Sequence, residues 1–190
     1  MLYNTSVNDL VDMNWDWKGG ILAYYFGYGA NMSKRYLENI RNIKPSSSQT
    51  ACILNYKLVM NLKGPNFIEP GFANICHYEG EKVEGVVHEV TQSDLDRIVA
   101  SEGETYELVE APVTLGNETV LVQTLRCKEN IPEDLPASRR YMKILIAAAV
   151  ENNLSSSYIE LLKDKKSVYY PILSEIFAIR IYFWVKSRAK

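Results

Sequence analysis

The chain has 190 residues, of which 47% are hydrophobic and 23% charged, and its formal net charge is −2. These values are typical of a globular protein and predict one domain with a sizeable core. The near-neutral charge and the lack of a basic cluster argue against a nucleic-acid-binding protein.

The cysteines, Cys52, Cys76 and Cys127, are widely spaced and odd in number. That pattern favours neither a disulfide framework nor a zinc site, so we expect free thiols, a cytoplasmic location and no metal. The N-terminal stretch carries acidic residues and no basic residue before Lys18, which is not the pattern of a secretory signal.

The stretch YYFGYGANMSKRYLENI, residues 24–40, predicts a strand, a Gly-rich turn and a helix in direct succession. This arrangement directs several backbone N–H groups to one spot, which suits an anion or a developing oxyanion. Its G-x-G spacing is also found in dinucleotide-binding turns. Met32 occupies the third small position, however, and no acidic residue for a ribose occurs between Glu38 and Glu69. A Gly-rich turn without a ligand is the other interpretation.

The next segments read as strands. We expect a loop over residues 44–50, a strand over 51–62 and a Gly/Pro/Asn-rich connection over 63–72. A β-hairpin should follow over residues 73–91, with its turn at YEGEK, residues 78–82.

A helix is predicted from Thr91 to Gly103. Thr91 with Asp94 three residues later is a plausible capping pair, and Gly103 suits the position after a helix end.

Glu102 falls on the apolar side of this helix. Leu95, Ile98 and Val99 form the apolar stripe at i, i+3 and i+4, and Glu102 follows at i+7. A carboxylate on a buried face needs partners, and burial tends to raise the pKa of a carboxyl group, as proton transfer near neutral pH requires. Alternatively, the side chain turns into water at a frayed last turn.

Two strands over residues 106–115 and 118–127 surround a turn at Gly116–Asn117. After a loop we expect a buried helix over 138–153 and a short helix that begins at Ser157. Strands in the middle followed by helices predict an α+β fold with a mixed or antiparallel, barrel-like sheet.

The run Ile172–Val185 is apolar but contains Glu175 and Arg180, and it is shorter than the ~20 residues of a membrane-spanning helix. We expect it to pack on the body of the protein or, as the less favoured alternative, against a second subunit in a homodimer. His77 and His88 lack further ligands at metal spacing and are predicted to be surface or core residues.

Four motifs in the same order resemble the γ-glutamyl cyclotransferases and their AIG2-like relatives. YYFGYGANM is similar to that family's Y-G-S-N-[LM] loop after an aromatic strand. GFANICHYEGEKVEGVVHEVTQSDLDRIVASEG resembles its small-residue strand, its G-V-V-type strand and the helix that ends in an E-G pair. YMKILIAAAVENNLSSSYIELL resembles its late helices. The resemblance covers residues 23–162.

The resemblance implies a small mixed β-barrel flanked by helices, as one domain over 1–190 with extra terminal segments at 1–22 and 171–190. It also implies cyclisation of a γ-glutamyl amide to 5-oxoproline, without a cofactor. Carried over by position, Glu102 is the catalytic acid/base. The substrate-binding residues are then Tyr28, Gly29, Ala30, Asn31, Tyr106 and Tyr158. Ala30 stands where the family loop has serine.

Three functions remain open at this point. The first is a γ-glutamyl cyclotransferase whose leaving group is a peptide such as Cys-Gly of glutathione, an amino acid, an amine or a carrier-linked group. The second is a non-catalytic module of the same fold that binds a small molecule, which the missing loop serine favours. The third is an interaction protein that uses its C-terminal apolar run. A small-molecule γ-glutamyl substrate is the expected partner.

Overall fold

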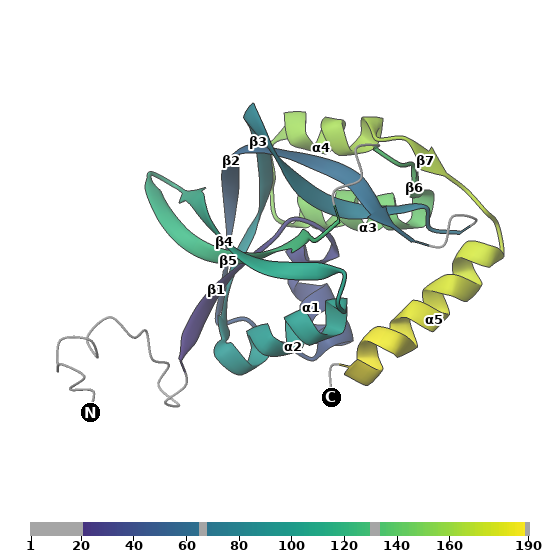
Figure 1. The fold of residues 1–190 in the computed structure, drawn as a ribbon, viewed down its shortest axis with the longest axis horizontal. Helices are drawn as coiled ribbons and strands as arrows, with labels where there is room; N and C mark the ends of the chain where they lie inside the picture. Colours follow the sequence, from purple (N-terminus) through teal and green to yellow (C-terminus); the bar gives the residue numbers. More distant parts are fainter. Residues whose placement is uncertain (1–20, 65–67, 130–133, 189–190) are drawn as a thin grey trace.

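The computed structural model describes residues 21–64, 68–129 and 134–188, and a closed five-stranded barrel lies at its centre (Figure 1). The strand order around the barrel is β1-β3-β2-β4-β5. β1 pairs parallel with β5, and the other pairs are antiparallel. The bounds are β1 (Leu22–Gly27), β2 (Ser47–Lys63), β3 (Gly71–Thr91), β4 (Tyr106–Leu115) and β5 (Glu118–Cys127). The predicted α+β class with a small mixed barrel is confirmed.

Helices pack around this barrel in two groups (Figure 1). One group lies beside β1 and the other beside β2 and β3, and a short 3₁₀ turn, η2 (Ala30–Met32), follows β1. The helices are α1 (Lys34–Arg41), α2 (Gln92–Glu102), α3 (Arg139–Glu151), α4 (Ser156–Asp164) and α5 (Leu173–Arg188). Two short strands, β6 (Ala137–Ser138) before α3 and β7 (Ser167–Val168) after α4, pair in parallel with each other.

The alternation of side chains along β1 divides the core into two parts. Phe26 packs in the larger cluster with residues of β2, β3, α3 and α4. Tyr25, its neighbour, points to the other face and packs with Leu37 of α1 and with Leu95 and Ile98 of α2. Because successive strand residues face opposite sides, one strand anchors both groups of helices.

The predicted hairpin turn at residues 78–82 is wrong. β3 runs without a break from Gly71 to Thr91, and both of its halves pair with β2. The pairing jumps from Leu54 with Lys82 to Tyr56 with His77, so residues 78–81 bulge out of the ladder. An exposed bulge with a glycine has the same composition as a turn, which explains the error.

Two boundaries also differ from the sequence prediction. β2 begins at Ser47, inside the predicted loop 44–50, because Ser47 pairs with Glu89 of β3. α4 begins at Ser156 instead of Ser157, since the Ser155 hydroxyl caps it by accepting a hydrogen bond from the Tyr158 N–H. The predicted capping of α2 by Thr91 is confirmed.

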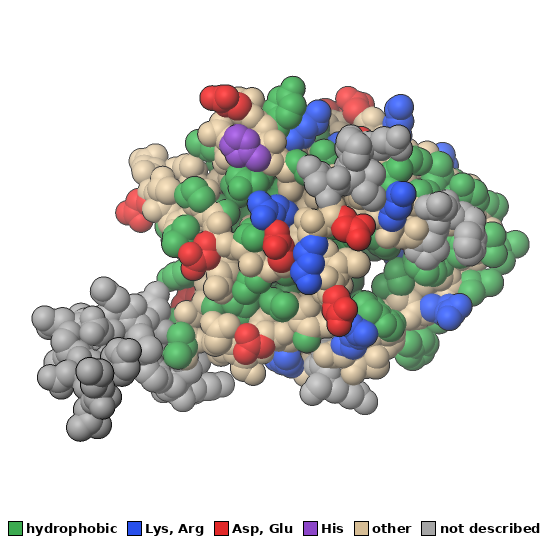
Figure 2. All heavy atoms as spheres, in the orientation of Figure 1, with side chains coloured by type: hydrophobic (Ala, Val, Ile, Leu, Met, Phe, Trp, Pro, Cys, Tyr) green, Lys and Arg blue, Asp and Glu red, His purple; other side chains and the backbone are tan. Residues whose placement is uncertain are grey.

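The C-terminal helix α5 packs on α1 and α2 and has apolar side chains on every side, interrupted by Glu175 and Arg180. Val185 is buried, whereas Ile176 on the outer face is 53% exposed. Figure 2 shows hydrophobic side chains gathered along this side of the molecule, with a hollow between part of α5 and the body. The segment therefore packs on the body with one face only. A homodimer through the other face stays a prediction.

No helix within the three described stretches is long and apolar enough to cross a membrane. Residues 1–20, most of the segment predicted as an N-terminal extension, lie outside the described residues.

Candidate active site

The Gly-rich loop after β1 folds back tightly on itself. A Cβ atom at Gly27 would lie 2.8 Å from the carbonyl oxygen of Asn31, so only glycine allows the chain to turn here. In the described loop, the N–H groups of Met32 and Ser33 donate to the carbonyls of Gly29 and Ala30, and the N–H groups of Ala30 and Asn31 make no turn or loop hydrogen bond. Binding of an anion by these N–H groups stays a prediction.

Asn31 joins this loop to four elements, β1, α1, α2 and β3. Its side-chain Nδ2 donates to the Tyr25 hydroxyl and to Glu102 Oε1, both at 3.0 Å. Its Oδ1 accepts from Arg41 Nε at 2.8 Å, and its carbonyl accepts from His88 Nε2 at 2.9 Å. Asn31 is buried, and all of its side-chain polar atoms have partners, which fixes the loop relative to Glu102.

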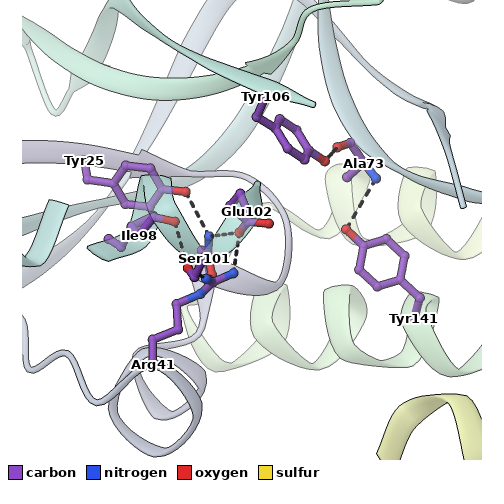
Figure 3. Close-up of polar contacts among 9 residues, drawn as sticks. Tyr25, Arg41, Ala73, Ile98, Ser101, Glu102, Tyr106 and Tyr141 are labelled. Carbon is purple, nitrogen blue, oxygen red and sulfur yellow. Dashed lines mark hydrogen bonds and ion pairs between the residues drawn. The ribbon is translucent and has the colours of Figure 1, made fainter. Parts of the chain in front are cut away.

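Glu102 ends α2 and forms an ion pair with Arg41, the last residue of α1 (Figure 3). The guanidinium group also donates to the Ser101 hydroxyl, and only 3% of the Arg41 side chain is exposed. Burial, the largest single effect, would lower the pKa of Arg41. The Glu102 carboxylate together with the nearby Tyr36, Tyr25 and Tyr106 outweighs burial, so the pKa of Arg41 is raised. Arg41 is therefore a permanent cation beside Glu102.

The two oxygens of the Glu102 carboxylate have different surroundings. Oε1 accepts hydrogen bonds from Arg41 and Asn31. Oε2 has no partner among the described residues, and the side chain is 23% exposed at the wall of a cavity. The side chain is thus held in place instead of turned into water, the alternative that the sequence left open.

The cavity beside Glu102 has a volume of about 330 Å³. Its lining includes most of the residues predicted for the site, namely Tyr28, Gly29, Ala30, Asn31, Glu102 and Tyr106. The structure brings these six together from the loop after β1, from η2, and from α2 and β4. It does not bring Tyr158 to them, because this residue is buried on α4 in the larger core cluster.

Hydrogen-bonded tyrosines form part of the cavity wall. Tyr106 donates to the Ala73 carbonyl at 2.8 Å, and the Tyr141 hydroxyl accepts from the Ala73 N–H at 3.3 Å (Figure 3). Tyr28 donates to the Leu125 carbonyl. Burial raises the pKa of Tyr28, Tyr106 and Tyr141, so these hydroxyls stay neutral near neutral pH.

Two residues of the site were not predicted from the sequence. Arg41 follows the buried Leu37 by four residues, so it lies on the apolar face of α1. That is the signal that drew attention to Glu102, and it was available for Arg41 as well. Tyr141 lies at the start of the late-helix motif and carries no signal of its own.

His88 of β3 fixes the backbone of the loop through a hydrogen bond to Asn31. It is fully buried, its Nε2 donates to the Asn31 carbonyl, and its Nδ1 accepts from the Ser48 hydroxyl at 2.8 Å. Burial lowers the pKa of His88 to about 4. It is the core histidine that the sequence suggested, whereas His77 is exposed.

The burial of His88 predicts a loss of stability in mild acid. An unfolded histidine has a pKa near 6.5, so the unfolded chain takes up the proton first as the pH falls. Stability that is fully present above pH 6.5 is then lost towards pH 4, by about 3 kcal/mol from this group. Urea unfolding between pH 7 and pH 4 measures the loss. In His88→Gln the fall should be smaller, and an equal fall in both proteins contradicts the assignment.

Within the described residues, no group of three or more His, Cys, Asp and Glu side chains is arranged to hold a metal ion. Cys52, Cys76 and Cys127 form no disulfide bond with one another.

Comparisons with known proteins find relatives of one kind. Residues 82–162 match the model of the AIG2-like family. Gamma-glutamyl cyclotransferase aclK of Aspergillus oryzae is 27% identical over 174 residues, which cover 79% of this chain and 63% of that protein. Gamma-glutamyl cyclotransferase gliK of Claviceps purpurea is 29% identical over 164 residues, which cover 78% of this chain and 73% of that one. The chain thus spans less than two thirds of the A. oryzae relative.

Solved structures show the same fold. An uncharacterized protein from Homo sapiens superposes with a TM-score of 0.71 at 24% identity, over 84% of this chain and 98% of that one. A structure described as a gamma-glutamyl cyclotransferase superposes with a TM-score of 0.68 at 22% identity, over 84% and 99%. The predicted resemblance to γ-glutamyl cyclotransferases and AIG2-like proteins is confirmed.

Proposed function

We propose that the chain is a γ-glutamyl cyclotransferase that converts a γ-glutamyl amide into 5-oxoproline and a free amine, with Glu102 as general acid and base. The observation that supports this most is the position of the Glu102 carboxylate. One oxygen is fixed by Arg41 and Asn31, and the other is free at the wall of a cavity beside the N–H donors of the loop.

The reaction needs a folded substrate more than a strong nucleophile. The α-amine of the substrate attacks its own γ-carbonyl carbon and closes a five-membered ring. Well-oriented intramolecular attack can reach effective molarities of about 10⁵ M or more. A cavity that holds the γ-glutamyl chain bent therefore supplies a large part of the rate, and the tyrosine wall is rigid enough to do so because its hydroxyls are bonded to backbone groups.

Proton transfer is the remaining task. Two protons must move from the α-ammonium nitrogen to the leaving nitrogen while the new C–N bond forms and the old one breaks. Glu102 Oε2 can accept each proton from the first nitrogen and donate it to the second. The ion pair with Arg41 and the hydrogen bond from Asn31 hold the carboxylate in position for this transfer.

The N–H groups of the loop can donate hydrogen bonds to a negatively charged group of the substrate. The N–H groups of Ala30 and Asn31 can bind the α-carboxylate of the glutamyl group or the oxyanion that develops on the γ-carbonyl. The alanine at position 30 removes a side-chain hydroxyl but leaves these backbone donors in place.

Release of 5-oxoproline tests the proposal. Wild-type protein is incubated with glutathione, γ-glutamyl amino acids and γ-glutamylamines, and 5-oxoproline is measured by chromatography. Turnover of at least one compound is expected, and turnover of none contradicts the proposal.

A non-catalytic module that binds a γ-glutamyl compound is the second candidate. The ion pair with Arg41 favours it, because this contact also gives Glu102 a structural role that joins α1 to α2. Calorimetric binding of the same compounds without 5-oxoproline release would support this candidate instead.

Two further parts of the sequence interpretation stay proposals. The widely spaced, odd-numbered cysteines, which form no disulfide bond with one another, support a cytoplasmic location. We also propose that residues 1–190 form one domain, whose core is the barrel and its helices over residues 23–162.

A further inference from the structure

The wall that α5 adds to the cavity is apolar and aromatic. Phe177, Ile181, Trp184 and Val185 all face into it. The same stretch of α5 borders two further grooves on either side of the helix, which Phe72 and Ile68 help to line. The hollow beside α5 in Figure 2 lies in this region. The space next to the catalytic carboxylate therefore continues along apolar surface.

The leaving group of the proposed reaction lies next to the side chains of α5 that line the cavity. Glu102 has to reach the leaving nitrogen to protonate it, so this nitrogen lies beside Glu102. Two side chains of α5 lie beside the same point of the chain: from where a Cβ atom at Gly103 would be, Arg188 Nη1 is 3.6 Å away and Trp184 Cη2 is 3.9 Å away. The Arg188 guanidinium packs on the Trp184 ring and does not line the cavity. The group attached to the leaving nitrogen therefore extends along Trp184 and the neighbouring side chains of α5.

The described part of the cavity lining has no cation that is available to bind a negatively charged leaving group. Arg41 and Lys63 are the cations among the described residues that line it. The donors of Arg41 are engaged with Asn31, Ser101 and Glu102, and Lys63 is exposed to water. A carboxylate on the leaving group would also lie near the negative charge of Glu102.

The volume of the cavity leaves room for such a group. At about 330 Å³ it is at the lower end of the range for sites of drug-sized ligands, which are larger than a γ-glutamyl group. The two grooves along α5 extend this space.

We propose that the substrate is a γ-glutamyl amide of a bulky apolar amine, and that Phe177, Ile181 and Trp184 determine this specificity. The inference rests on the proposed function, since it concerns the leaving group of that reaction. The γ-glutamyl end binds at the loop and Glu102, and the apolar amine packs on α5 until the C–N bond breaks.

A substrate series with a constant γ-glutamyl group tests the proposal. The compounds are γ-glutamyl ethylamide, γ-glutamyl benzylamide and γ-glutamyl-alanine, and kcat/KM is measured from 5-oxoproline release. Wild type should turn over the benzylamide on the order of 10-fold or more faster than the ethylamide, because a filled apolar pocket discriminates by about that factor. Equal values for the two amides, or a preference for γ-glutamyl-alanine, would overturn the proposal.

Variants of α5 locate the effect. Trp184→Ala should lower kcat/KM for the benzylamide about 10-fold and for the ethylamide less than about twofold, and Trp184→Phe should restore most of the loss. Ile176→Ala is the matched control, because Ile176 is on the outer face of the same helix and borders none of the three spaces. Equal losses on both amides in Trp184→Ala would contradict a role in specificity.

The outcome can be separated from the failure of the proposed function. If no compound is turned over, calorimetry with Glu102→Gln compares the binding of benzylamide and ethylamide directly. Tighter binding of the benzylamide supports the apolar subsite, and equal binding overturns it.

Arg188 packs over the Trp184 ring at 4.4 Å from its centroid. A preference for γ-glutamyl-alanine that disappears in Arg188→Ala would assign the subsite to a carboxylate instead.

Discussion

Replacement of Glu102 by Gln is expected to lower kcat for every γ-glutamyl substrate by about 10²–10⁴-fold, the usual contribution of a general base. Glutamine has the same size, and its amide oxygen can still accept from Arg41 and Asn31. What it lacks is a group at the position of Oε2 that can take up a proton. Because no other carboxylate among the described residues lines the cavity, no neighbour can replace it.

The matched control for this change is Glu104→Gln. Glu104 is exposed, is two residues further along the chain and does not line the cavity. Its replacement removes the same charge and should leave kcat within about twofold of wild type. Urea unfolding of both variants checks that the fold is intact. If Glu102→Gln retained more than a tenth of the wild-type kcat, Glu102 could not be the base.

Replacement of Arg41 by Met is expected to reduce both stability and activity. It leaves the Glu102 carboxylate without its cation and removes a hydrogen-bond partner from Asn31 and Ser101. Breaking a buried ion pair typically costs about 3–5 kcal/mol, and the partial exposure of Glu102 puts this case near about 3 kcal/mol. The free energy of unfolding in urea measures the loss.

A double variant separates the charge effect from packing. Glu102→Gln in the Arg41→Met background removes the unpaired charge. The loss of stability in the double variant should therefore be smaller than the sum of the losses in the two single variants. Arg35→Met is the control, because Arg35 is an exposed residue of the same helix. Additive losses, or a change in Arg41→Met no larger than in Arg35→Met, would show that the ion pair does not stabilise the fold.

Much of the barrel could be predicted because its strands alternate and its turns are short. β4 and β5 were placed by a two-residue turn, and α2 by the capping hydroxyl of Thr91. The bulge in β3 could not be predicted, because a polar segment with a glycine has the same local preferences whether it reverses direction or bulges. Only the pairing of both halves with β2 decides between them, and that is a long-range property.

The predicted residues that line the cavity are those marked by a local pattern in the sequence. Glu102 is marked by its place on an apolar stripe, and the loop by its glycines. The ion pair joins α1 to α2 across 61 positions of sequence, so its existence depends on how two helices pack on β1. The side of α5 that faces the cavity could not be predicted either, because a helix that is apolar all round has no periodicity to mark a buried face. For Tyr158 the local motif was misleading. The motif predicted that this residue lies in the site, but in the fold it lies in the core.

The way in which α5 is attached has a consequence for how long a bound molecule stays. Among the described side chains of this helix, Val185 is the buried one, so α5 can detach locally at a small fraction of the free energy of global unfolding. A molecule in the cavity touches Phe177, Ile181 and Trp184 and adds its contact area to the attachment of the helix. Occupancy and closure are then thermodynamically linked, and each favours the other by the same free energy. A bound apolar amine would hold α5 in place. Once the C–N bond has broken and the amine has left, α5 would be less firmly attached, and 5-oxoproline could then leave the cavity more readily.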